Sequence, residues 1–114
     1  MADPTDEKEV AAFSRISPTA MLLAYFRTFT DIPFAAELAA ATDAEAVSRA
    51  LIEGSGLRLE DSRLNAPFAE ARYKCILSAL RARGLEQVLE LGSGLSFRSL
   101  AMAGDPRVIY VETD

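Results

Sequence analysis

The chain has no histidine among its 114 residues and only one cysteine, Cys75. Without histidine it lacks the commonest general base and the commonest zinc ligand in proteins, and we expect no metal site. A lone cysteine cannot form an internal disulfide, and its position in an apolar helical pattern predicts a buried structural thiol rather than a reactive one. Any chemistry must therefore rest on carboxylates, tyrosines, backbone groups or a bound cofactor.

Long apolar runs and clusters of positive charge are missing as well. No stretch approaches the roughly 18 apolar residues that a membrane span needs. A net charge of −5 without a basic run argues against binding to nucleic acid or to an anionic membrane. The N-terminal sequence MADPTDEKEV is acidic and polar, unlike a secretory signal. These absences predict a cytoplasmic protein.

What is present divides the chain into three parts. Residues 1–13 are expected to be a mobile tail, 14–84 a helical region, and 85–114 a strand–helix–strand segment. Ser17 and Pro18 have the character of a helix start, because serine caps helices and proline suits the first turn. Apolar residues then recur at helical spacing and predict a core or lid face: Met21, Leu22, Tyr25, Phe26 and Phe29.

Local signals divide the helical region further. Thr42 and Glu45 have the spacing of a capping box, which predicts a helix that ends at Gly54 in the left-handed conformation. Residues 54–66 are polar and contain glycine, so they predict a loop. A longer helix is expected over 68–83. Its apolar face is predicted to consist of Tyr73, Ile76, Leu77 and Leu80.

The most informative segment runs from residue 87 to 114. An apolar run containing Glu90 leads into Gly92-Ser93-Gly94; a short helical pattern and a second apolar run follow, and the segment ends with Glu112 and Asp114. Glycine permits a tight turn and close approach of the backbone to a ligand, and a helix N-terminus directs free N–H groups the same way. An acid about 20 residues later is placed to accept hydrogen bonds from ribose hydroxyls. The pattern predicts a nucleotide-binding βαβ unit.

The residues around the turn narrow the class of ligand. Phe97 stands where the dinucleotide fingerprint has its third glycine, and no Gly-Lys-Ser/Thr follows as in a P-loop. Glu90 lies within an apolar strand, where a buried carboxylate needs a partner. The ammonium group of an amino-acid-bearing nucleoside meets that need better than a pyrophosphate, which Glu90 would repel.

The glycine segment ELGSGLS resembles the first motif of class I S-adenosylmethionine-dependent methyltransferases, although Ser96 stands where many of them have a third glycine. A narrower resemblance, to the leucine carboxyl methyltransferase-like group with its bacterial polyketide-type O-methyltransferases, covers residues 16–114. It rests on four segments: ISPTAMLLAYFRTFTDIPF, FAEARYKCI, QVLELGSGLSFRSLA and VIYVETD. The resemblance implies a Rossmann-like α/β fold, S-adenosyl-L-methionine as cofactor, and methyl transfer to an oxygen of a small molecule.

The same resemblance assigns roles to individual residues. The glycine turn would surround the methionine part of the cofactor, with Glu90 nearby. Asp114 would bind the ribose hydroxyls, with Glu112 as the competing choice. Arg72 would bind the cofactor carboxylate or would be an ordinary exposed helix charge, and Arg27 is a weaker candidate for that carboxylate or for the substrate. No residue is assigned as a catalytic base.

One βαβ unit takes roughly 30 residues, and a doubly wound sheet needs several. We therefore expect the chain to be the N-terminal part of a longer methyltransferase and to be inactive alone. Two alternatives remain. The chain is a short protein whose sheet is completed by self-association or by a partner chain, or it is a non-catalytic module that binds a nucleoside or a protein.

Overall fold

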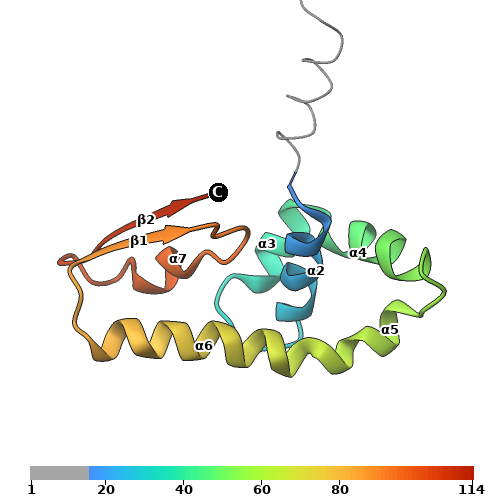
Figure 1. Ribbon diagram of the computed structural model, residues 1–114, viewed down its shortest axis with the longest axis horizontal. Helices are drawn as coiled ribbons and strands as arrows, with labels where there is room; N and C mark the ends of the chain where they lie inside the picture. The colour runs from blue at the N-terminus through green and yellow to red at the C-terminus, as the bar shows by residue number, and fades with distance from the viewer. Residues whose placement is uncertain (1–15) are drawn as a thin grey trace, which may run out of the picture.

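In the computed structural model the described part of the chain is residues 16–114, and the tail expected over 1–13 lies outside it. The described chain is mixed α/β: helices precede a strand–helix–strand segment whose strands form a two-stranded parallel sheet. Helix α6 (Ala66–Ala82) connects the two parts, with helices α2 to α5 gathered over its N-terminal half and the sheet over its C-terminal half (Figure 1).

Helix α2 (Pro18–Arg27) lies at the centre of the helical part. It begins at Pro18 as expected, with Ser17 at the N-cap, although the side chain of Ser17 makes no capping hydrogen bond. It packs against α3 (Ala35–Ala41) and α4 (Ala44–Glu53). The resulting core combines aromatic and small residues: Ala24, Tyr25, Phe26, Ala39, Ala44, Leu59, Ala66, Ala69 and Leu95.

The capping box expected from Thr42 and Glu45 does not form. Asp43 is the N-cap residue of α4 and makes no side-chain capping bond. The hydroxyl of Thr42 instead donates a hydrogen bond of 2.9 Å to the carbonyl oxygen of Leu38. Because only two residues separate α3 from α4, Thr42 serves the end of the first helix rather than the start of the second.

Gly54 ends α4, but not in the left-handed conformation that the sequence predicted. Its φ is −61°, and the left-handed residue is Gly56, with φ of 82°. A Cβ atom on Gly54 would lie 2.9 Å from the carbonyl oxygen of Ala50. Close packing against the helix backbone, not backbone handedness, therefore favours glycine at position 54.

The segment predicted as a loop, 54–66, also contains helical structure. It includes the short helix α5 (Leu59–Ser62) and the 3₁₀ turn η1 (Arg63–Asn65). Leu59 is completely buried in the helical core. The composition of this segment is otherwise typical of loops. Burial of Leu59 offsets the conformational entropy that is lost when the segment becomes ordered.

Helix α6 buries a narrower face than predicted. Tyr73 and Leu77 are buried, whereas Ile76 and Cys75 are exposed. The prediction of a buried thiol was therefore wrong, because only one side of this helix is covered and Cys75 lies outside the buried stripe. Gly84 follows the helix with φ of 58°, in the left-handed conformation common at helix ends.

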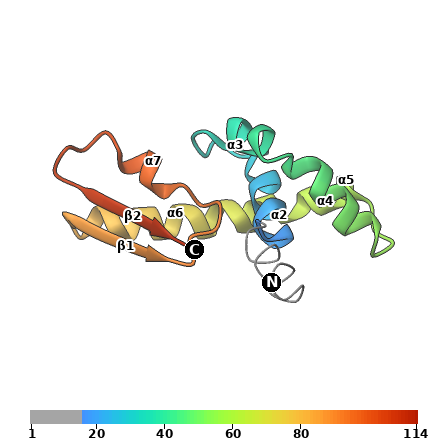
Figure 2. The same cartoon turned by 90° about the horizontal axis from the view of Figure 1, so that it is seen from above.

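The sheet consists of β1 (Gln87–Leu91) and β2 (Ile109–Thr113), connected through α7 (Arg98–Met102), and it places Glu90 directly opposite Glu112. Seen from above, both strands lie along the C-terminal half of α6 (Figure 2). Side chains alternate between two environments. Val88, Glu90, Tyr110 and Glu112 are partly buried, while Leu89, Leu91, Ile109 and Val111 are exposed.

Candidate functional site

The glycine turn lies at the carboxyl end of β1. Gly92 and Gly94 have φ values of 63° and 52°, a region that favours glycine. The backbone N–H of Ser93 donates a 2.9 Å hydrogen bond to the carbonyl oxygen of Thr113, which ties the turn to the end of β2. A Cβ on Gly92 would meet nothing within 4 Å, and one on Gly94 only the methyl of Ala20, at 3.6 Å. The backbone of the turn is thus accessible to a ligand.

Glu90 is satisfied by groups of this chain. One carboxylate oxygen forms an ion pair with Arg98 Nη2 at 3.0 Å and accepts a hydrogen bond from Ser96 Oγ at 3.1 Å, and the other accepts one from the hydroxyl of Tyr110 at 2.5 Å. The side chain of Arg98 is 8% exposed and that of Glu90 15%. Both oxygens of this carboxylate therefore have partners without any contribution from a ligand.

Arg98 thus takes the place that a ligand ammonium group was expected to fill beside Glu90. It comes from the first turn of α7, four residues after Gly94, and its buried guanidinium holds the strand, the turn and the helix together. Through these partners Glu90 joins β1 to α7 and to β2.

The two acids at the end of β2 have different surroundings. Glu112 accepts a 3.2 Å hydrogen bond from the backbone N–H of Ser99, and it also lies 3.5 Å from Ser96 Oγ, whose single proton is donated to the closer Glu90. It thereby satisfies a free N–H in the first turn of α7. Asp114 is exposed, one residue beyond the carbonyl that binds the turn. Of the two candidates for ribose hydroxyls, Asp114 is the one whose carboxylate has no such partner among the described residues.

The two arginine candidates lie on different helices. Arg72 is exposed on α6 and forms no ion pair within residues 16–114. Arg27, at the end of α2, donates a 2.7 Å hydrogen bond from Nη1 to the carbonyl oxygen of Leu95, just after the glycine turn. Burial lowers the pKa of Arg27, and the positive charges of Arg98 and Arg72 lower it further. The sequence made Arg27 a weaker candidate than Arg72 for the cofactor carboxylate. In the structure, Arg27 is bonded to the segment that directly follows the glycine turn.

Tyr73 lies beside both Arg27, which is partly buried, and Arg98, which is buried, and it was not predicted to belong to the site. Its ring centroid lies 5.7 Å from the guanidinium carbon of Arg27 and 5.5 Å from that of Arg98. Burial raises the pKa of its hydroxyl. Arg27 Nε, Arg98 Nε and Arg98 Nη1 are buried without a hydrogen-bond partner in the described structure. Buried N–H groups of this kind favour an acceptor nearby.

Tyr110 and Ser96 were missed as site residues as well. Burial, followed by the hydrogen bond to Glu90, raises the pKa of the Tyr110 hydroxyl, which is consistent with its role as a donor to that carboxylate. Tyr110 stands two residues before Glu112 and hence on the same face of β2. Strand periodicity together with an acid on that face was the signal that could have identified it.

A hollow of about 260 Å³ lies beside these groups, between α3 and the segment that follows the turn. Arg27 and Ser96 contribute polar atoms to it. The remaining lining is mainly apolar: Ile32, Pro33, Phe34, Ala35, Leu38, Phe97 and Leu100, with Glu37. The arrangement offers an apolar surface next to a cation, two residues along the chain from Gly94.

Two further features bear on the class of site. The described residues contain no group of three or more histidine, cysteine or acidic side chains placed to hold a metal ion. Within 16–114, no helix combines the length and apolar character required to cross a membrane.

Comparison with known proteins adds no relative. No protein-family model matches the chain, and no curated protein or solved structure shows significant similarity to it.

Proposed function

We propose that the carboxyl edge of the β1–β2 sheet binds S-adenosyl-L-methionine, and that the chain is the cofactor-binding part of a methyltransferase. One observation carries the proposal. The glycine turn is joined to the end of β2 by the Ser93–Thr113 hydrogen bond, so an accessible turn backbone and the exposed Asp114 lie at the same edge of a parallel sheet. Ligands of open parallel sheets bind at this edge.

Different residues of the chain suit different parts of the cofactor. The open space above Gly92 and Gly94 leaves room for its methionine part, and Asp114 suits its ribose hydroxyls. Arg27 or Arg72 supplies a cation for its carboxylate. The bound cofactor supplies an electrophilic methyl group on a sulfonium; these residues bind and orient it, and no residue of this chain is assigned to act on the methyl acceptor.

Glu90 contributes to the proposed site indirectly. Its oxygens are already occupied by Arg98, Ser96 and Tyr110, so it holds the glycine turn in place rather than contacting the cofactor. Glu112 acts in the same way through its hydrogen bond from the backbone of Ser99.

The sequence resemblance extends the proposal to the acceptor. It suggests an oxygen nucleophile, either a carboxylate or a hydroxyl of a small molecule. Methyl transfer of this kind depends mainly on holding the two reactants in line. The part of the site assigned to this chain is the cofactor half of that arrangement.

The test is a calorimetric titration with S-adenosylhomocysteine. We expect Gly94→Asp to abolish binding, because its carboxylate would occupy the ligand space at a residue with φ of 52°. Gly56→Asp is the matched control: it adds the same charge at a glycine that is also left-handed, with φ of 82°, and where a Cβ meets nothing within 4 Å. Unchanged affinity in the Gly94→Asp variant would remove the glycine turn from the site.

A second function is favoured by the exposed apolar face of the sheet. Leu89, Leu91, Ile109 and Val111 are between 47% and 75% exposed, whereas parallel sheets are normally covered on both faces. This face supports a non-catalytic module, or a nucleoside-binding unit, that self-associates or is completed by a partner chain. Titration with S-adenosylhomocysteine separates these two cases. If the ligand binds stoichiometrically only to the associated form, association completes the site. If it binds to neither form, the chain is an interaction module.

A further inference from the structure

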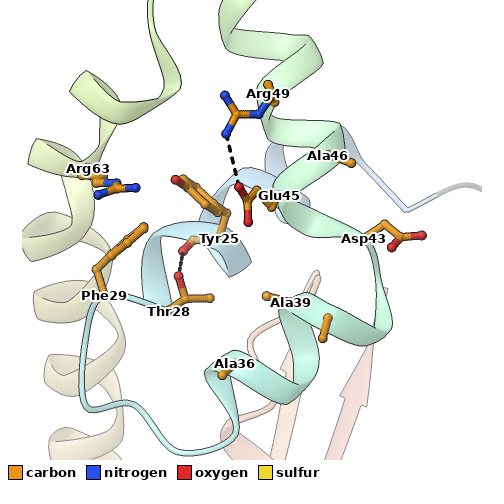
Figure 3. Close-up of a pocket in the computed structure, with 11 residues that line it drawn as sticks. Tyr25, Thr28, Phe29, Ala36, Ala39, Asp43, Glu45, Ala46, Arg49 and Arg63 are labelled. Atoms are coloured by element: carbon orange, nitrogen blue, oxygen red, sulfur yellow. Dashed lines mark hydrogen bonds and ion pairs between the residues drawn. The ribbon is translucent and has the colours of Figure 1, made fainter.

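A second cavity, of about 800 Å³, lies in the helical part of the molecule. It is bounded by α2, α3, α4 and η1, and it opens to solvent (Figure 3). Its volume is within the range of small-molecule sites. None of the residues that line it belongs to the cofactor site proposed above.

The walls of the cavity differ in character. Methyl groups of Ala36, Ala39, Ala40 and Ala46 form one side and leave the space open. The rings of Tyr25 and Phe29 form the other, with their centroids 5.2 Å apart in an edge-to-face arrangement. A flat aromatic molecule would contact both an apolar helix surface and aromatic rings in this space.

The cations at the cavity are not equivalent. Arg49 is bound by three carboxylates, those of Glu45, Glu53 and Glu60, at 2.9–3.3 Å. The guanidinium of Arg63 lies 4.8 Å from the ring centroid of Phe29, and it forms no ion pair with a described residue. Its N–H groups are therefore available to an acceptor in the cavity.

The hydroxyl of Tyr25 is a second unused donor. The residue is 4% exposed, and its hydroxyl forms no hydrogen bond within the described chain. Figure 3 shows the ring extending from α2 with its hydroxyl end toward the space between Arg49 and Arg63. Two acids also line the cavity, but Glu45 is bound to Arg49 and Asp43 points away from the centre. The donors of Tyr25 and Arg63 together match the oxygens of a carboxylate.

We infer that this cavity binds a planar aromatic carboxylate, with the ring system between the alanine wall and the Tyr25–Phe29 pair and the carboxylate at Arg63 and the Tyr25 hydroxyl. The inference does not depend on cofactor binding at the glycine turn. The aromatic walls provide contact area, and the charge-assisted hydrogen bonds provide selectivity for the anion.

The experiment is a titration of the isotopically labelled 114-residue chain with 2-naphthoate, followed by backbone amide NMR. We expect saturable binding, with the largest shift changes at Tyr25 in α2, at Phe29 just after it, in α3 near Ala40, and at Arg63. The neutral analogue 2-naphthamide is expected to bind about tenfold more weakly, the loss associated with one charge-assisted hydrogen bond.

Matched variants separate the cavity from other apolar surfaces. Ala40→Leu fills the cavity and is expected to abolish saturable binding of 2-naphthoate. Ala41→Leu adds the same group on an exposed part of α3 outside the lining and is expected to leave that binding unchanged. Ala36→Leu is a second filling variant, and amide spectra establish that each variant is folded.

Charge is tested by Arg63→Gln, which is expected to remove the preference for 2-naphthoate over 2-naphthamide, while Arg83→Gln, outside the cavity, retains it. Shifts concentrated at Leu89 and Ile109, undiminished binding in both filling variants, or absence of saturation in the unmodified chain would overturn the inference. Binding of S-adenosylhomocysteine to the filling variants is expected to match that of the unmodified chain, so the two proposals fail independently.

Discussion

The glycine turn depends on the buried ion pair between Glu90 and Arg98. It joins β1 to α7, and Ser96 and Tyr110 complete the hydrogen bonding of the carboxylate. Pairs of this kind contribute little beyond a well-packed apolar substitute, but removing one partner leaves a buried charge without compensation. The consequence of losing either residue should therefore be large and local.

Arg98→Met is expected to lower the free energy of unfolding by about 3 kcal/mol, because Glu90 loses its cation while remaining buried. Urea denaturation followed by circular dichroism measures the change. Arg107→Met is the control, since Arg107 pairs with Asp105 at the surface and an exposed pair contributes less than about 1 kcal/mol. Equal small effects from both variants would show that the Glu90–Arg98 pair is not important for stability.

At the scale of elements, α6 connects the helical part to the sheet and sets where β1 begins. The helix ends at Ala82, and Gly84 reverses the chain with φ of 58° before the strand starts at Gln87. A side chain at Gly84 would meet no atom within 4 Å, so backbone strain alone opposes substitution there. The exit from α6 is thus fixed by the conformation of a single residue.

Gly84→Ala is expected to destabilise the protein by about 1 kcal/mol, the approximate cost of a left-handed conformation for an L-residue. Gly104→Ala, at a glycine with equally open surroundings but without a left-handed φ, is expected to be neutral or slightly stabilising. Thermal unfolding of the two variants beside the unmodified chain gives the comparison. A Gly84→Ala protein as stable as the Gly104→Ala protein would contradict the role assigned to Gly84.

At the scale of the whole molecule, the two faces of the sheet are unequal. Tyr110 and Val108 pack against a cluster formed by α6, α7, the start of α3 and Ile32, and the opposite face exposes four aliphatic side chains. Contiguous exposed apolar surface of this kind promotes association. The same face is the feature that favours an interaction module as the second candidate function.

We expect the chain to self-associate with increasing concentration and Leu91→Lys to raise the dissociation constant about tenfold, because a charge replaces apolar surface at the face. Leu64→Lys is the control: Leu64 is 81% exposed but lies on η1, away from the sheet. Sedimentation velocity over a concentration series measures both. A chain that stays monomeric throughout, or equal weakening by Leu64→Lys, would count against association through this face.

Local chemistry allowed much of the element order to be predicted. Pro18 marks the start of α2 and Gly84 the stop after α6, because proline and glycine restrict or permit particular backbone angles whatever surrounds them. The apolar runs on either side of the glycine turn predicted the two strands. Composition alone failed for the segment around Leu59. It predicted a loop, whereas the segment contains α5, in which Leu59 is buried.

The glycines of the turn, the acids at the end of β2 and the lack of histidine can be read from residue type and spacing alone. The pairing of Glu90 with Arg98, the contact of Arg27 with Leu95 and the exposure of Cys75 could be found only from the folded chain. The same is true of Tyr25 and Arg63, which are far apart in the chain and border one cavity. The reason is physical: backbone preferences act within a few residues, whereas burial and charge pairing depend on which surfaces the folded chain brings together.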